Sequence, residues 1–287
     1  MIEKGTLYIV GTPIGNLGDI TLRAIETLKS VDIILAEDTR QTLKLLNHLK
    51  ITKHSISYHR HNEDEKIDEV VALLDDGKNI ALVSDAGMPR ISDPGESLIK
   101  YLKQNGYPVT VVPGVTALTT AVAMSPIDSE TFTFEGFLPM RPTRRRERLE
   151  KLKYETRLMV FYEAPHKILN TLKDLYKYLG DRNICIAREL TKVHEECLDT
   201  TLKEAIDMIE ENGIKGEIVL LVEGNKAGDV ELENKKMIES GESTLTNKEL
   251  VEKYVLDGMT KKEAIKQVAK KRGLNKNEVY MECVEND

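Results

Sequence analysis

Short apolar runs alternate with helical spacings of apolar residues along the first part of the chain. The runs are rich in β-branched residues and occupy 6–10, 32–36, 79–83 and 108–112. Between them, apolar residues recur at helical spacing, as at Leu22, Ile25 and Leu28. Continuous apolar strands that alternate with helices indicate a parallel sheet covered on both faces. The pattern therefore predicts a doubly wound α/β domain over residues 1–125.

Residues 126–228 show further strand-like runs, again separated by helical spacings. These runs lie at 131–137, 157–163, 184–190, 194–202 and 216–224. The runs 184–190 and 194–202 are neighbours in the chain and are typical of an antiparallel pair. The second region is therefore predicted to be an α/β domain with a mixed sheet.

The C-terminal part of the chain changes character twice. Residues 229–243 are polar and lack apolar periodicity, which is typical of a linker. Residues 244–287 have a helical pattern, in which Ala269, Gly273 and Val279 have the spacing of a helix-turn-helix. The lysines around this turn favour two interpretations equally: a solvated three-helix cap, or a surface that contacts phosphates.

Composition limits the possible partners and surroundings. The chain has 287 residues and a formal net charge of −7, so a nucleic acid would have to be met by a local basic patch. Cys185, Cys197 and Cys283 lie far apart in sequence, which argues against a zinc site and a disulfide framework and fits a reducing cytoplasm. The histidines show no metal-binding spacing. Neither a signal peptide nor a membrane span of ~18–20 apolar residues is expected.

Unusual loops follow the four predicted strands of the first domain, at 11–21, 37–42, 84–95 and 113–118. In an open α/β sheet, ligands bind beyond the carboxyl ends of the strands, so these loops are expected to share one ligand-binding edge. None of them contains the phosphate-binding pattern of an ATPase or GTPase, and the first is a poor match to the dinucleotide fingerprint.

The loop 84–95, SDAGMPRISDPG, contains two Ser-Asp pairs with different predicted roles. Ser84 to Gly87 are expected to turn the chain so that backbone groups can approach a ligand. Asp93, Pro94 and Glu96 have the pattern of a helix start, with Asp93 as the N-cap residue. The first pair is therefore predicted to be functional and the second to be structural.

A set of motifs appears in order over residues 1–225. They read GTPIGNLGDIT, AEDTR, SDAGMPRISDPG, VVPGVTAL, GFLPMRP, FYEAPHK and ARELTKVHEE. Together they resemble the RsmI-type small-subunit ribosomal RNA 2'-O-methyltransferases, which have the tetrapyrrole methylase fold of class III S-adenosylmethionine methyltransferases. The resemblance implies two α/β domains with a cofactor cleft between them, and the tail resembles the helix-turn-helix domain of that family.

The resemblance also implies a set of residues that bind S-adenosylmethionine. These are Pro13, Asp85, Ala86, Gly87, Ile91, Thr116, Ala117, Glu163 and Thr200. The chain departs from the family pattern at Met88 and Arg90, where relatives usually have Thr and a small residue. Thr116 stands where the family usually has Ser and keeps the hydroxyl group. The alternative for Ile91 and Ala117 is ordinary packing, and for Asp85 it is a turn-forming side chain.

Methyl transfer to a ribose hydroxyl needs a positioned acceptor, and a general base or charged orienting group would help. The candidates are Asp38 and Arg40 after the second strand, and Glu163 and Lys192 in the second domain. Asp38 and Lys192 are the preferred pair. The alternative for Lys192 is a solvated charge at a strand end.

Two basic segments are candidates for RNA binding in an otherwise acidic protein. The arginine-rich segment contributes Arg141, Arg144, Arg145, Arg146 and Arg148, and the tail contributes Lys262, Lys266 and Lys270. The resemblance implies a cytidine in the decoding region of 16S ribosomal RNA as substrate, within an assembled or nearly assembled small subunit. It also implies a homodimer that acts in the cytoplasm, with no metal and no membrane.

Two other functions remain open on the sequence. A tetrapyrrole C-methyltransferase would keep the fold but would not need the basic segments. A ligand-sensing regulator would place the second tail helix in a DNA groove, although that helix carries Glu278, Glu282 and Glu285. The acidic helix favours RNA-backbone docking or packing over DNA reading.

Overall fold

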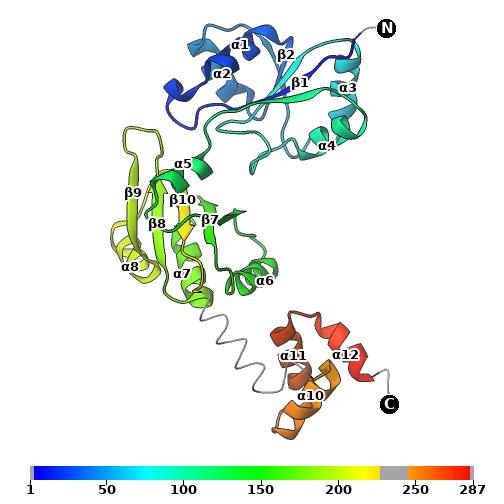
Figure 1. Ribbon diagram of the computed structural model, residues 1–287, viewed down its shortest axis with the longest axis vertical. Helices are drawn as coiled ribbons and strands as arrows, with labels where there is room; N and C mark the ends of the chain where they lie inside the picture. Colours follow the sequence, from blue (N-terminus) through cyan, green and yellow to red (C-terminus); the bar gives the residue numbers. More distant parts are fainter. Residues whose placement is uncertain (1–2, 227–244, 285–287) are drawn as a thin grey trace. The chain divides into compact units, whose positions relative to one another are not determined.

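The computed structural model describes residues 3–226 and 245–284, so the linker predicted at 229–243 lies outside the described residues. The chain divides into two compact units, Met1–Gly224 and Asn225–Asp287, and each is described by itself (Figure 1). Within the two described stretches, no helix combines the length and the apolar character that crossing a membrane requires.

The first sheet is parallel and has the strand order β3-β2-β4-β1-β5. Four strands lie where the sequence predicts them: β1 (Leu7–Val10), β2 (Ile33–Ala36), β4 (Ile80–Val83) and β5 (Val109–Val112). The edge strand β3 (His54–Ser57) was not predicted. Its polar sequence, HSIS, suits an edge position and lacks the apolar run on which the other predictions rest.

Helices cover both faces of this sheet because successive strand residues point to opposite sides. Ile80 and Leu82 of β4 join a core with α3 (Ile67–Asp75) and α4 (Glu96–Gln104). Ala81 and Val83 join a second core with α1 (Leu22–Ser30) and α2 (Thr39–His48). Each buried Leu or Val contributes roughly 1.5–3 kcal/mol. The doubly wound arrangement is confirmed.

The second sheet is mixed, with the order β6-β7-β10-β8-β9. Its strands are β6 (Phe132–Gly136), β7 (Leu158–Glu163), β8 (Asn183–Arg188), β9 (Glu196–Thr201) and β10 (Ile218–Val222). Only β6 and β7 are parallel; the predicted antiparallel pair β8-β9 is confirmed. One face shares a core with α6 (Pro142–Leu152), α7 (Ile168–Leu179) and α8 (Leu202–Asn212).

Helix α5 (Ala117–Met124) lies on the opposite face of the second sheet, although it follows the last strand of the first sheet (Figure 1). Ala121 is buried in a core with Ile14, Val160 and Val219. The backbone N–H of Leu118 also donates to the Tyr162 hydroxyl at 3.0 Å. The segment after β5 therefore crosses from one sheet to the other. Ile14 belongs to the loop after β1, which continues into a short 3₁₀ helix, η1 (Leu17–Asp19).

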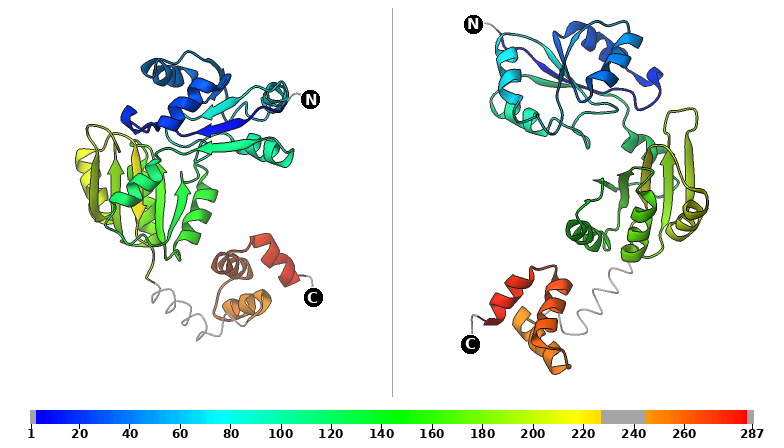
Figure 2. Two further views of the ribbon diagram at one scale, coloured as in Figure 1. Left: turned by 45° about the horizontal axis from the view of Figure 1, so that its top comes forward. Right: turned by 180° about the vertical axis from the view of Figure 1, so that it is seen from behind.

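The C-terminal unit is a three-helix fold of α10 (Asn247–Leu256), α11 (Lys261–Arg272) and α12 (Lys276–Val284), drawn in orange to red in Figure 2. Capping boxes begin α10 at Thr246 and α11 at Thr260. Gly273 ends α11 with a left-handed φ of 64°, and Ala269 and Val279 are buried in the unit's own core. The spacing that predicted a helix-turn-helix therefore has the predicted geometry.

Candidate active site

A cavity of about 410 Å³ lies where the first sheet's loops meet the second sheet. Its lining includes Ile14 after β1, Glu37 after β2, Asp85 after β4 and Thr116 after β5. The other wall is formed by β7, β10 and nearby loops, including Tyr162. The four unusual loops therefore do share one edge of the sheet, as parallel strand ends must.

Most residues predicted to bind the cofactor line this cavity, and they come from three separate segments: Asp85, Ala86, Gly87, Ile91, Thr116, Ala117 and Glu163. Pro13 is not among the lining residues; it is buried between Thr12 and the lining residue Ile14. The seven lining residues converge on one cavity, which supports their assignment to the cofactor site; the assignment stays a prediction.

Thr200 lies away from this cavity, at the opposite end of the second sheet. The register pairs Thr200 with Ile184, and Ile184 with Val222, whereas the cavity is lined by Ile218 at the other end of β10. Four residues of strand span roughly 13 Å. Thr200 instead lines a separate cavity of about 430 Å³. The structure therefore does not support the assignment of Thr200 to the cofactor site. The sequence does not fix the register of this hairpin, so the position of Thr200 could not be predicted from it.

Backbone contacts tie the first, third and fourth loops together. Thr12 and Gly87 exchange two backbone hydrogen bonds, of 2.9 and 3.1 Å. A Cβ placed on Gly11 would lie 2.7 Å from the Cα of Gly114, and one on Gly114 would lie 2.9 Å from the Cα of Gly11. The first and fourth loops therefore approach each other at backbone distance, which a side chain at Gly11 or Gly114 would prevent.

Five carboxylates line the cavity: Glu37, Asp85, Asp93, Glu163 and Glu217. Burial, followed by the charge of Asp85, raises the pKa of Glu37. Burial also raises the pKa of Asp85, opposed by a hydrogen bond from the Asp38 backbone N–H. A cavity with this charge favours a cationic ligand over an anionic one.

Asp93 has a different position from the one predicted. Helix α4 begins at Glu96 with Gly95 as its N-cap residue, and no side chain caps it. Asp93 instead lines the cavity, where burial, followed by the charge of Glu37, raises its pKa to about 7. The structural role predicted for the second Ser-Asp pair is therefore wrong, because Ser92 and Gly95 take positive φ values of 69° and 123° and redirect the chain.

Asp38 and Arg40 form a local cap at the start of α2. Asp38 is the N-cap residue; its carboxylate accepts from the Arg40 backbone N–H at 2.8 Å and from the Arg40 guanidinium at 2.7 Å. The side-chain hydrogen bond from Arg40 lowers the pKa of Asp38 to about 2. Asp38 is therefore a weak base at neutral pH, and neither residue lines the cavity.

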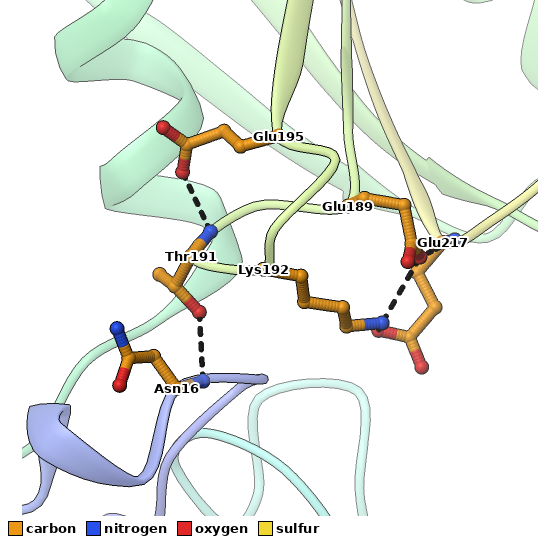
Figure 3. A network of polar contacts seen from close by, with 6 residues as sticks. All are labelled: Asn16, Glu189, Thr191, Lys192, Glu195 and Glu217. Atoms are coloured by element: carbon orange, nitrogen blue, oxygen red, sulfur yellow. Dashed lines mark hydrogen bonds and ion pairs between the residues drawn. The ribbon is translucent and has the colours of Figure 1, made fainter.

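Lys192 lies in the β8-β9 loop (Figure 3), and its ion-pair partner Glu217 lines the cavity. Its ammonium group pairs with Glu189 and Glu217, each at 3.0 Å. Burial disfavours the charged form, but these hydrogen bonds outweigh it and raise the pKa of Lys192. The side chain lies over Gly15, where an added Cβ would be 2.6 Å from the Lys192 Cγ. Lys192 is thus a protonated link between two carboxylates, which disfavours a role as general base.

The β8-β9 loop has a strained backbone. Glu189 and Thr191 have φ values of 50° and 66°, and a β-branched residue rarely takes such a value. Glu195 accepts from the Thr191 backbone N–H at 2.6 Å, and the Thr191 hydroxyl accepts from the Asn16 backbone N–H at 3.1 Å (Figure 3). Strain of this kind persists where contacts fix the conformation, as at functional sites.

Glu163 is buried and has partners on both carboxylate oxygens. It accepts from the Ala164 backbone N–H at 2.9 Å and from the Thr171 hydroxyl at 2.6 Å. Thr171 in turn accepts from the Arg145 guanidinium at 2.9 Å, and Arg145 pairs with Asp174 at 2.7 Å. Glu163 can face a ligand, but its hydrogen bonds favour a positioning role over proton transfer.

The arginines of α6 and of its N-cap position, Arg141, fall into two groups. Arg141, Arg144 and Arg146 are exposed. Arg145 is bound internally, as described above, and Arg148 forms an ion pair with the nearly buried Glu135. The segment therefore offers fewer cations for RNA than the sequence predicted, because helical periodicity turns Arg145 towards α7.

In the C-terminal unit, the three lysines predicted to bind RNA, Lys262, Lys266 and Lys270, are all exposed on α11. Helical spacing of four residues places them on one face of the helix. The acidic residue Glu282 of α12 accepts from the Asn247 side chain at 2.6 Å, so part of its charge is used within the unit. The RNA role of these lysines stays a prediction.

The structure joins Cys185 and Cys197 as a disulfide, with the Cα atoms 6.4 Å apart. The sequence was interpreted as arguing against a disulfide framework, and this pair is a correction to that interpretation. The hairpin β8-β9 brings the two residues together diagonally, since Cys197 pairs with Ala187 and Cys185 with Asp199. Their sulfur atoms and a carboxylate oxygen of Asp199 also lie within 4.8 Å of one another. Cys283 is buried in the C-terminal core.

Sequence reasoning missed several residues that line the cavity, among them Glu37, Asp93, Phe137, Tyr162 and Glu217. Glu37 and Tyr162 could have been found, because each lies at the end of a predicted strand within a recognised motif. Phe137 is 57% exposed and packs edge-on against Tyr162, with ring centroids 5.8 Å apart. Glu217 follows a loop, and no motif in the sequence marks it as a site residue.

Known proteins match both the sequence and the fold. Residues 6–206 match the family model described as Tetrapyrrole (Corrin/Porphyrin) Methylases. A solved cobalt precorrin-4 methyltransferase has a TM-score of 0.57 at 20% identity, covering 76% of this chain and 94% of that chain. A uroporphyrin-III C-methyltransferase from Thermus thermophilus, complexed with S-adenosyl homocysteine, has a TM-score of 0.56 at 18% identity, covering 76% and 97%. At these identities the two structures show the fold alone.

Sequence relatives are much more similar. The relative named "Ribosomal RNA small subunit methyltransferase I" from Halalkalibacterium halodurans is 48% identical over 97% of this chain and 94% of its own length. The protein of the same name from Thermotoga maritima is 49% identical over 77% of this chain and 100% of its own length. The motifs, the two-sheet fold and these matches agree. The chain therefore belongs to the tetrapyrrole methylase family and, within it, to the ribosomal RNA small subunit methyltransferase I group.

Proposed function

We propose that this protein transfers a methyl group from S-adenosylmethionine to the ribose 2'-hydroxyl of a cytidine in the decoding region of 16S ribosomal RNA. The observation that carries the proposal is the 48% identity, over nearly the whole chain, to a relative named as a small-subunit ribosomal RNA methyltransferase. The nucleotide and the ribose position come from the motif resemblance. The same resemblance supports a homodimer that acts in the cytoplasm on an assembled or nearly assembled small subunit.

The acidic cavity fits the cofactor. S-adenosylmethionine carries a positive sulfonium and a positive ammonium group, and five carboxylates line the cavity. The apolar lining, which includes Ile14, Ile91 and Leu190, suits an adenine ring. When bound, the cofactor supplies the reactive methyl group, and the residues of this chain orient it and hold the acceptor.

The same charge constrains the RNA. Phosphates would be repelled by the carboxylates, so only a nucleoside is expected to enter the cavity, while the RNA backbone stays outside. The exposed Arg144 and Arg146 of α6, and Arg141 at its N-cap position, can contact that backbone. A tetrapyrrole substrate is not favoured, because uroporphyrin-type compounds carry several carboxylates and would meet the same repulsion. The DNA-binding alternative is not favoured either, since the relatives are named as RNA methyltransferases.

The proposal is tested by transfer of a tritiated methyl group. Small subunits and naked RNA from cells that lack the gene are incubated with the protein and labelled cofactor. Label on a ribose of the small-subunit RNA is expected, with the subunit as the better substrate. Absence of label in both substrates, or label that remains on a base after ribose-specific digestion, would contradict the proposal.

The two groups of arginines give a matched test of RNA binding. Arg144→Ala should weaken RNA binding and reduce the slope of log K against log salt by about 0.7–0.9, the value for one lost phosphate contact. Arg145→Ala should leave that slope unchanged and lower the free energy of unfolding by about 1–3 kcal/mol, because Asp174 and Thr171 lose their donor. Anisotropy titrations over a salt series and urea unfolding measure the two effects. An unchanged slope for Arg144→Ala would remove α6 from the RNA interface.

A further inference from the structure

We propose that Asp93 is the general base that accepts the proton of the ribose 2'-hydroxyl. The inference rests on the proposed function and names the group that its chemistry needs. Asp93 was assigned a capping role on sequence grounds, yet Gly95 occupies the N-cap position and no side chain caps α4. Its carboxylate lines the cavity instead.

The loop around Asp93 is held on both sides. Before it, Arg90 and Ser92 take φ values of 72° and 69°, and the Arg60 guanidinium donates to the Ser92 carbonyl. After it, Glu63 accepts from the Gly95 backbone N–H at 2.9 Å and from the Ser97 hydroxyl at 3.2 Å. Strained backbone that is clamped in this way fixes a side chain in a defined direction.

Charged and polar groups from several neighbouring elements affect the pKa of the Asp93 carboxyl group. Glu37 at the end of β2 and Asp85 at the end of β4 are negative, and Arg60 after β3 is positive. Ser84 lowers the pKa of Asp93, and Tyr162 of β7 lies close enough that the charge of Asp93 adds to the effect of burial in raising the tyrosine's pKa. Burial is the largest influence, and together these groups bring the pKa of Asp93 to about 7. A base with a pKa near the working pH is the most effective.

The four candidates taken from the sequence fit the role less well. The pKa of Asp38 is lowered to about 2 by its hydrogen bond with Arg40, and Lys192 is held protonated by two carboxylates. A guanidinium such as that of Arg40 cannot accept a proton. Glu163 accepts hydrogen bonds on both of its oxygens.

The proposed step is balanced. As the 2'-oxygen forms its bond to the methyl carbon, the bond from that carbon to sulfur breaks, and its electron pair stays on the sulfur of S-adenosylhomocysteine. The 2'-hydroxyl proton passes to the Asp93 carboxylate and then to water. The sulfonium loses one positive charge in the step, and the released proton carries that charge away.

Asp93→Asn tests this role with a nearly isosteric side chain. Its kcat on small subunits, measured at saturating S-adenosylmethionine, should fall about 10²–10⁴-fold, the usual contribution of a general base. The wild-type kcat should rise with pH through a midpoint near 7, and the variant should lose that dependence. Asp207→Asn, at an exposed position of α8, is the matched control and should behave like the wild type.

Three results would overturn the assignment, and they are distinguishable. If the wild type labels ribose and Asp93→Asn is equally active with the same pH profile, Asp93 is not the base. If Asp93→Asn fails to bind S-adenosylmethionine in calorimetry, Asp93 is a cofactor ligand instead. If the wild type transfers label to a nucleobase and not to a ribose, the proposed function fails. The assignment of Asp93 as the general base for a ribose hydroxyl then fails as well.

Discussion

Gly114→Ala should raise the Kd for S-adenosylmethionine by about 100-fold or more. The new Cβ would lie 2.9 Å from the Cα of Gly11 and 3.0 Å from its carbonyl carbon. These are backbone atoms, so no side chain can rotate away and the two loops must separate. The loops carry Ile14, Thr116 and Ala117, which line the cavity, so their separation would remove contacts with the cofactor. A 100-fold rise in Kd corresponds to about 2.8 kcal/mol of lost binding free energy.

Calorimetric titration with the cofactor measures this effect, and thermal unfolding shows whether the fold survives. Overpacking should lower the free energy of unfolding by about 1–3 kcal/mol. Gly106→Ala is the matched control. Gly106 has a φ of 71° and nothing within 4 Å of an added Cβ, so this variant should lose about 1 kcal/mol of stability and keep its cofactor affinity. Wild-type affinity in Gly114→Ala would show that the close contact does not define the site.

Asp93→Asn should stabilise the protein at high pH, whatever it does to activity. In the unfolded chain the carboxyl group titrates near its ordinary pKa of 3.8, whereas in the folded protein the pKa is about 7. The folded state therefore holds a proton that the unfolded state has lost between these values, so wild-type stability falls as pH rises through this window. Asparagine carries no charge and avoids the loss.

The full shift would correspond to about 4 kcal/mol, but Asp93 is only partly buried, and solvent screening reduces the expected gain to about 1–2 kcal/mol. The difference in the free energy of unfolding between variant and wild type should be near zero below pH 4 and complete above pH 7. Urea unfolding at several pH values measures it, with Asp207→Asn as control. A gain that is independent of pH would mean that packing, not charge, separates the two proteins.

The fold could be predicted in large part because apolar periodicity reports burial. The strands β1, β2, β4 and β5 each contain a short apolar run and were located within a residue or two, although β5 is an edge strand with Thr110 and Val111 exposed. β3 escaped because an edge strand needs no apolar run. The position of α5 also could not be predicted, since its apolar residues would suit either sheet.

The parts of the candidate site that depend on the order of the parallel strands could be predicted from the sequence. The parts that depend on local backbone dihedral angles or on strand register could not. Parallel strand ends must meet, so Asp85 and Thr116 could be placed together from sequence. Asp93 could not be placed there, because its direction is set by positive φ values at Ser92 and Gly95. Thr200 failed for a related reason: a shift along the β8-β9 hairpin moves a residue to the far end of the sheet. Partners such as Asp174 for Arg145 depend on packing between helices.

The C-terminal unit has a consequence for the history of its gene. Its helices carry their own capping boxes at Thr246 and Thr260, and its buried residues form a core of their own. The relative from Thermotoga maritima is matched over its whole length by 77% of this chain. A segment that supplies its own helix signals and its own core can be acquired or lost by recombination without redesign of the enzyme to which it is joined.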